Sequence, residues 1–229
     1  MSANSATQQY LSALQHSDSF FPSGLISFSY GLESLINQEQ TFTQEDVLAF
    51  LSDQLLLRWG GFDRGILAAV YHNVNDAVAI AKLDKLLDAM TLPEELRRGS
   101  RMAGKALMGV HHQLGSKQVQ NYELQIKQQS LPGHLPIIQG LAWSEAGMNL
   151  EQAMAASAHG VCIGILGAAI RLGVLGHIGA QQLLSSLHAP LAALLATAVP
   201  EPDEMHAFTP IAEVASMRHP YQDGRLFAN

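Results

Sequence analysis

The segment from Gly99 to Ala106 nearly matches a phosphate-binding loop. It reads Gly-Ser-Arg-Met-Ala-Gly-Lys-Ala and departs from the pattern Gly-x-x-x-x-Gly-Lys-Ser/Thr only at its last residue. The pattern works because a strand leads into glycines whose amides bind phosphates, while the final hydroxyl binds magnesium. Ala106 has no hydroxyl, and the preceding Pro-Glu-Glu-Leu-Arg-Arg favours a helix. We therefore interpret this segment as a helix with small residues on a packed face.

Histidine and cysteine offer little else for catalysis or metal binding. The ten histidines include no His-x-x-x-His pair, and the adjacent His111 and His112 would point about 100° apart on a helix. Cys162 is the only cysteine and lies in an apolar stretch, where a thiolate is costly. No Gly-x-Ser-x-Gly motif is present. The missing motifs lower the expectation of an enzyme, and the residues predict neither a cofactor nor a set of metal ligands.

Composition excludes further classes of protein. The 229 residues carry a formal charge of −7, with 48% hydrophobic and 14% charged residues. The chain is too apolar to be disordered and too acidic to bind a nucleic-acid backbone. A single cysteine cannot form an internal disulfide, and the N-terminus lacks the basic and apolar regions of a signal peptide. We expect a cytoplasmic protein that binds neither nucleic acid nor membrane.

The elements that would position any site are helices. Leu and Ala make up 63 residues, whereas Val, Ile and Thr make up 28, so composition favours helix over strand. The uncharged stretch from Gln152 to Ile170 is rich in Ala and Gly, which indicates a buried helix rather than a membrane span. We expect one all-α domain over residues 1–229, a single-domain helical bundle with an irregular N-terminal loop and a C-terminal tail from about residue 200.

Capping residues, glycines and prolines set the expected helix boundaries. Four helices are bounded in this way: one after Thr43 with Asp46, one from about Pro93 to about Leu114, one from Asn149 with Gln152 to Gly173, and one from about Ile178 to about Ala198 that Pro190 is expected to kink.

Two segments are unusual for an all-α chain. Residues 18–33 mix serines, a proline and two glycines with aromatics, which predicts a loop with forced backbone angles leading into a helix. Residues 217–227 gather basic and aromatic side chains, the types enriched at interface hot spots, in a tail broken by prolines. Each segment is open to two interpretations. Either segment could be a recognition surface. Otherwise residues 18–33 would cap one end of the bundle, and residues 217–227 would dock on their own domain.

Five motifs follow one another along the chain: Asp18-Ser with Pro22-x-Gly24 and Ser29-x-Gly31-Leu-Glu33; Glu95-Leu-Arg97-Arg98-Gly-Ser-Arg101-Met-Ala-Gly104; His134-Leu-Pro136-Ile-Ile-Gln-Gly140; Ala168-Ala-Ile-Arg171-Leu-Gly173-Val-Leu-Gly176; and Arg225-Leu-Phe227. In this order they resemble the urease accessory protein UreF family. One such match would be weak, but five in order are specific. The chain departs from the family pattern at Phe28, where a histidine is usual, and at Pro220, where a glutamate usually follows the histidine.

The resemblance implies a noncatalytic, dimer-forming maturation protein. Proteins of this family bind the accessory protein UreD, also called UreH, and with it recruit the GTPase UreG to apo-urease so that nickel reaches the urease active site. An effect on GTP hydrolysis by UreG is also implied. The tail would order against UreD/UreH, and Arg171 would lie near the partner-facing surface or a passage for nickel. The residues carried over as partner-binding are Asp18, Pro22, Gly24, Ser27, Ser29, Gly31, Glu33, Arg171, Arg218, His219, Tyr221, Arg225, Leu226 and Phe227.

Two other functions stay open from the residues alone. A helical bundle could bind a small molecule in a pocket lined by scattered His and Met side chains. It could also carry nickel through His111, His112 or His219.

Overall fold

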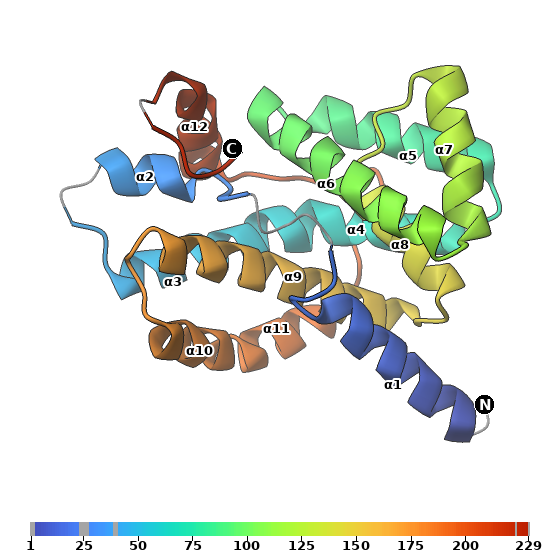
Figure 1. Ribbon diagram of the computed structural model, residues 1–229, viewed down its shortest axis with the longest axis horizontal. Helices are drawn as coiled ribbons and strands as arrows, with labels where there is room; N and C mark the ends of the chain where they lie inside the picture. Colours follow the sequence, from blue (N-terminus) through green and yellow to red (C-terminus); the bar gives the residue numbers. More distant parts are fainter. Residues whose placement is uncertain (1–2, 23–27, 39–40, 223, 229) are drawn as a thin grey trace.

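The computed structural model describes residues 3–22, 28–38, 41–222 and 224–228 (Figure 1). Within these residues the secondary structure is helical and no strand is present, so the prediction of an all-α fold is confirmed. The helices are α1 Ala3–Ser17, α2 Leu32–Gln38, α3 Gln44–Asp53, the π-helix η2 Gln54–Asp63, α4 Arg64–His72, α5 Ala77–Met90, α6 Glu94–Gln113, α7 Lys117–Gln129, α8 Leu135–Glu145, α9 Leu150–Arg171, α10 His177–Ser186, α11 His188–Leu195, α12 Pro210–Arg218 and the 3-10 helix η3 His219–Tyr221.

Side-chain caps begin two helices where the sequence predicts them. The Thr43 hydroxyl accepts from the backbone N–H of Asp46 at 3.3 Å, and the Asp46 carboxylate accepts from the backbone N–H of Thr43 at 2.8 Å. Asn149 and Gln152 form the same reciprocal box at the start of α9, at 2.8 and 3.1 Å. Each box satisfies two backbone donors that the first helical turn leaves without partners. Both predicted starts are confirmed, and α6 confirms the predicted helix that follows Pro93.

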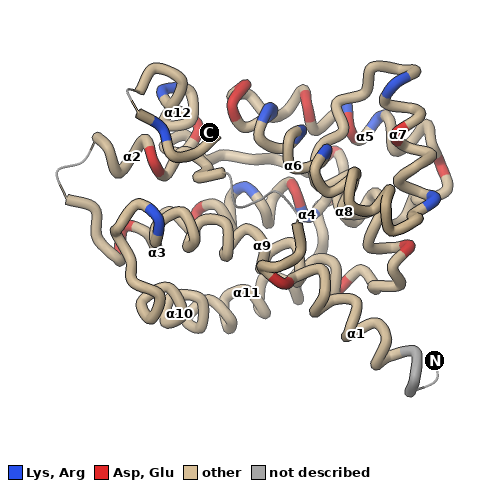
Figure 2. Tube along the Cα trace, viewed as in Figure 1, with Lys and Arg blue, Asp and Glu red and all other residues tan. Residues whose placement is uncertain are grey.

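Helix α9 forms the centre of the core. It crosses the middle of the molecule, with α2 and α3 on one side, α10 and α11 on another, and α1 and α8 near its N-terminal part (Figure 1). Figure 2 shows it without charge between its two ends. It is long and apolar enough to cross a membrane, but 61% of its most apolar 18-residue stretch is buried inside the protein. Burial raises the pKa of the Cys162 thiol in this helix to about 12, so the thiol is not a reactive nucleophile.

A long π-helical segment joins α3 to α4. The backbone N–H of Arg64 bonds to the carbonyl of Trp59, five residues back, which is the wider spacing of a π-helix. Gly61 in this segment lets the backbone around His206 approach closely. A side chain on Gly61 would come within 2.6 Å of the His206 carbonyl oxygen. Segments of this kind are frequent at functional sites.

The predicted helix around Pro190 is two helices. α10 ends at Ser186 and α11 begins at His188, so the chain breaks ahead of the proline instead of kinking at it. Proline has no N–H to donate to the carbonyl four residues back, and its ring crowds that carbonyl. That carbonyl belongs to Ser186, the last residue of α10. The position of the break therefore follows from the proline. The sequence predicts a kink in one helix, whereas the structure has two separate helices.

A buried carboxylate organises the turn between α7 and α8. Asp84, on α5, is fully buried and accepts from the Tyr122 hydroxyl at 2.6 Å. It also accepts from the backbone N–H groups of Gly133 and His134 at 2.7 and 3.0 Å. The His134 ring in turn contacts the Asp88 carboxylate at 3.0 Å. The His-x-Pro motif of this chain is thus part of the scaffold.

The chain after α11 lies along η2 before it reaches α12. The backbone N–H groups of His206 and Phe208 donate to the carbonyls of Gly61 and Leu57, at 3.1 and 3.3 Å. α12 then packs against α2 and α6, and the C-terminus lies beside α12 and α2 (Figure 1). In this structure the tail is docked on its own domain, whereas its ordering by a partner stays a prediction.

Candidate partner-binding surface

Glu33 joins the N-terminal motif to the C-terminal tail. Its side chain, at the start of α2, is buried, and its Oε2 atom lies 2.7 Å from Nε2 of His219. The same carboxylate accepts from the backbone N–H groups of Leu226 and Phe227, at 2.7 and 3.3 Å. We call this group of contacts the Glu33 latch. It fixes η3 and the end of the chain against α2.

The backbone just before Glu33 provides the seat for α12. Gly31 has a φ of +87°, and a side chain there would lie 2.7 Å from the Ala212 carbonyl oxygen and 2.8 Å from Oγ of Ser216. Tyr30 also has a positive φ, of 57°. The sequence prediction of forced backbone angles in this segment is confirmed at these two residues. Because only glycine leaves room for the close approach of α12, Gly31 sets the position of the tail.

Arg171 meets the tail at the end of α9. Its guanidinium carbon lies 4.2 Å from the centre of the Phe227 ring, a cation–π contact. Its Nε also donates to the Gly167 carbonyl at 3.1 Å, which holds the side chain along its own helix. Phe227 is buried while Arg171 is exposed, so the arginine covers the ring from the solvent side. The motif around Arg171 and the last motif of the chain are thus in contact.

The outer face of the docked tail is apolar and basic. Ile211, Val214 and Met217 repeat every three residues along α12 and are 65%, 44% and 46% exposed. We call this face, together with the exposed residues that follow it, the tail surface. Its later members are Arg218, which donates to the Gln38 side chain at 2.9 Å, Tyr221, which is 89% exposed, Arg225, and Leu226, which is 71% exposed.

The predicted partner-binding residues divide into an inner and an outer set. Ser29, Gly31, Glu33, His219 and Phe227 are buried, so they shape the tail surface from within. The outer set, which faces solvent, consists of Arg171, Arg218, Tyr221, Arg225 and Leu226.

The first part of the N-terminal motif lies elsewhere. Asp18 and Pro22 are exposed near the end of α1, where they line a cavity with Trp143. The Asp18 carboxylate accepts from the backbone N–H of Phe20 at 2.7 Å, which makes it a turn residue. Gly24 and Ser27 lie outside the described residues.

Sequence reasoning missed the apolar members of the tail surface on α12. Ile211, Val214 and Met217 carry the signal that could have found them, an i, i+3, i+6 spacing after a proline that can begin a helix. The prolines around this segment pointed to an irregular tail, so the short helix between them was not predicted.

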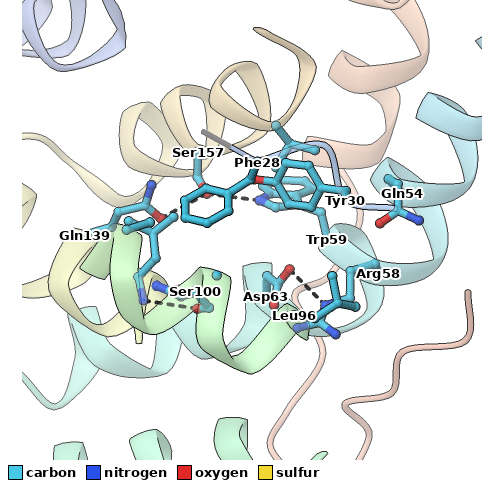
Figure 3. A pocket seen from close by; sticks show the side chains of 15 residues that line it. Phe28, Tyr30, Gln54, Arg58, Trp59, Asp63, Leu96, Ser100, Gln139 and Ser157 are labelled. Carbon is cyan, nitrogen blue, oxygen red and sulfur yellow. Dashed lines mark hydrogen bonds and ion pairs between the residues drawn. The ribbon is translucent and has the colours of Figure 1, made fainter. Parts of the chain in front are cut away.

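A small cavity lies under the N-terminal motif. Figure 3 shows Phe28 and Tyr30 near Trp59 on one side of it, and the Arg58–Asp63 ion pair, at 3.2 Å, on the other. Its volume is about 80 Å³. Sites for small organic ligands occupy roughly 300–1,000 Å³. This cavity has room for a few water molecules and is too small for a ligand of that size.

The three histidines of the nickel-carrier interpretation lie in separate environments. His111 stacks on His16, and His112 pairs with Glu123 at 2.7 Å. His219 belongs to the Glu33 latch. Within the part of the chain that the structure describes, no three His, Cys, Asp or Glu side chains gather in a way that could hold a metal ion.

Comparisons with known proteins agree with the family that the motifs indicate. The family model described as UreF matches residues 42–188. A urease accessory protein UreF from Trichodesmium erythraeum (strain IMS101) is 36% identical over 99% of this chain and 99% of its own length. Proteins of the same name from Paenarthrobacter aurescens (strain TC1) and Streptococcus salivarius (strain 57.I) are 30% and 27% identical, over 97% and 98% of this chain and 99% and 97% of their own lengths. The chain therefore belongs to the UreF family of urease accessory proteins, which are non-catalytic maturation factors.

Proposed function

We propose that this protein is an adaptor that binds UreD/UreH through the tail surface and, with it, recruits the GTPase UreG to apo-urease. Nickel is then the cargo of the assembly, and the adaptor modulates GTP hydrolysis by UreG through the position it gives that protein. The protein acts in the cytoplasm as a homodimer. This proposal rests on family membership for the partners and on the tail surface for the place of contact.

One observation carries the proposal: the tail is held in place by buried contacts while its apolar and basic side chains are exposed to solvent. The Glu33 latch and the Arg171–Phe227 contact hold a segment whose outer face exposes Tyr221 and Leu226. Exposed groups of large apolar side chains mark interaction sites, and Tyr and Arg are enriched among the residues that dominate binding energy. A surface fixed before binding loses less conformational entropy when the partner docks.

Co-expression with UreD/UreH and UreG tests the proposal. Size-exclusion chromatography with light scattering should show a stable complex of defined mass for the intact chain. Deleting residues 211–229 should leave a helical protein that no longer binds UreD/UreH. Retained binding by the truncated chain would remove the tail surface from the proposal, and the absence of any complex with folded protein would remove the adaptor function.

Point variants with matched controls separate the tail surface from general surface effects. Tyr221→Ser and Arg225→Ala should each weaken UreD/UreH binding at least about tenfold. Ile178→Ser, at a residue 74% exposed on α10, and Arg98→Ala, at an exposed residue on α6, are the controls and should leave the affinity within about twofold. Equal losses in both pairs would argue against a contact centred on the tail.

A further inference from the structure

Two imidazole rings stack where α1 meets the body of the protein. The ring of His16, in the last turn of α1, lies 5.1 Å from the ring of His111 on α6, with an angle of 11° between their planes. Phe21 lies against both rings, at 4.8 and 5.7 Å between centroids. The edge of Trp143, on α8, approaches His16 at 6.4 Å. The two histidines thus sit in an aromatic cluster that connects three helices.

The hydrogen bonds of this pair fit two neutral rings. Nδ1 of His16 lies 2.7 Å from the Ser12 carbonyl oxygen, which can only accept, so Nδ1 carries the proton. Nε2 of His16 and Nε2 of His111 are both buried without a hydrogen-bond partner among the described residues. A second proton on His16 would be buried without an acceptor, and a positive charge on either ring would lie at stacking distance from the other ring. Such a charge is costly.

The groups around the pair shift the pKa values of the two rings in both directions. Burial lowers the pKa of His111 to about 4, repulsion from His16 acts in the same direction, and Glu145 on α8 opposes it. Burial also lowers the pKa of His16, although its bond to the Ser12 carbonyl opposes the shift. Glu145 already accepts from the Ser116 hydroxyl and from two backbone N–H groups at the start of α7.

Three further titratable groups lie in this region. The exposed Asp18 carboxylate shares a cavity wall with His16, and His112 is bound to Glu123 at 2.7 Å. The α9 residues that line the same cavity are Ala156, Gly160, Ile163 and Gly164, which do not titrate. The nearby carboxylates therefore only partly offset the cost of a buried proton.

Helix α1 also packs against α9, and further contacts hold it at this end. The Ser12 hydroxyl donates to the Ala146 carbonyl at 3.0 Å, and Ala13 packs on the core. The N-terminal part of α1 points away from the body (Figure 1). Its side chains from Ala6 onward include no Asp, Glu, Lys or Arg, and Tyr10 and Leu14 are 66% and 68% exposed. The histidine pair therefore adds to the packing on α9 where the last turn of α1 meets the body of the protein.

We propose that His16 and His111 form a proton-sensitive clasp, which holds α1 against α6, α8 and α9 while both rings are neutral and releases it when either ring takes up a proton. Both groups bind protons more weakly in the docked state than in the released state. The docked state is therefore fully favoured above about pH 6.5 and loses ground as the pH falls from there towards 4. Release exposes the face of α1 that packs on the body, whereas Tyr10 and Leu14 are exposed already in the docked state.

Hydrogen–deuterium exchange of the full chain tests the clasp. Exchange rates corrected for their intrinsic pH dependence should show protection of residues 8–17 falling by about tenfold or more between pH 7 and pH 5, because each proton bound on release changes the equilibrium tenfold per pH unit. Protection of α9 should not change over this range. Unchanged protection of residues 8–17, or loss of protection in α1 and α9 together, would overturn the proposal.

Two variants and one titration complete the test. The double variant His16→Phe/His111→Phe keeps an aromatic stack but cannot take up protons, so α1 should stay protected at both pH values. His112→Gln, at the neighbouring exposed histidine, should respond to pH like the unaltered chain. A pH response that persists in the double variant contradicts the clasp. If that variant does not fold, an NMR titration of the unaltered chain decides: values below 6.5 for both rings support the clasp, and values at or above 6.5 overturn it.

Discussion

His219 and Glu33, which are 186 residues apart in sequence, meet in a contact of 2.7 Å that is closed to solvent. The carboxylate also receives the backbone N–H groups of Leu226 and Phe227. One buried side chain therefore ties the N-terminal motif to both η3 and the end of the chain. These two segments, far apart in sequence, are therefore fixed against each other.

Replacing the latch carboxylate should release the tail. Glu33→Gln keeps the size of the side chain but turns one acceptor oxygen into a donor, which would face the donors of the latch. We expect the free energy of unfolding to fall by about 1–3 kcal/mol, since buried donors lose their partner. Urea denaturation measures the loss, and hydrogen exchange of residues 219–227 should become faster. Gln38→Ala, which removes only the surface acceptor of Arg218, is the control and should cost less than about 0.5 kcal/mol. Equal effects of the two variants would contradict the role of the latch.

The seat for α12 should not tolerate a side chain at Gly31. Gly31→Ala combines a positive φ with contacts of 2.7 and 2.8 Å to α12, so α12 must move. Gly173→Ala is a matched control, because Gly173 has a φ of +77° with open space around its Cβ position. The control should cost about 1–2 kcal/mol from backbone strain alone, and Gly31→Ala should cost more. Thermal unfolding compares the two, and partner binding should fall only for Gly31→Ala. An equal loss of stability in both would mean that α12 does not press on this glycine.

The sequence predicts the helices better than it predicts how they meet. Thr43, Asn149 and Pro93 are local signals, so three helix starts follow from a few neighbouring residues. The Glu33 latch depends on residues nearly two hundred positions apart, and neither spacing nor composition reveals that pairing. The resemblance to the family placed Arg171 and Phe227 among the interaction residues, but only coordinates bring the two side chains into contact.

The glycines of the segment from Gly99 to Ala106, which nearly matches a phosphate-binding loop, have a structural explanation that can be tested. A side chain on Gly104 would collide with the Gly133 carbonyl oxygen, so the glycine lets the turn before α8 approach α6 closely. Gly109, on the same helix, has open space around its Cβ position. Gly104→Ala should therefore destabilise the protein by about 1–3 kcal/mol. Gly109→Ala should stabilise it by up to about 1 kcal/mol through helix propensity. Chemical denaturation gives both values, and a stabilising Gly104→Ala would contradict the close contact.

The contact between Arg171 and Phe227 should contribute modestly to stability and more visibly to the order of the tail. Phe227→Leu keeps most of the buried apolar area but removes the aromatic face, and Arg171→Gln removes the charge. A double-mutant cycle in urea should give a coupling of about 0.5–1 kcal/mol, the range for a cation–π contact at a solvent-facing site. The same cycle with Arg98 in place of Arg171 should give no coupling, since that arginine is exposed on α6. Because Arg171 covers the ring that the latch places, Arg171→Gln should also speed hydrogen exchange at the end of the chain while leaving α9 protected. A coupling near zero would mean that the arginine merely lies over the ring, and the tail would then be held by Glu33 alone.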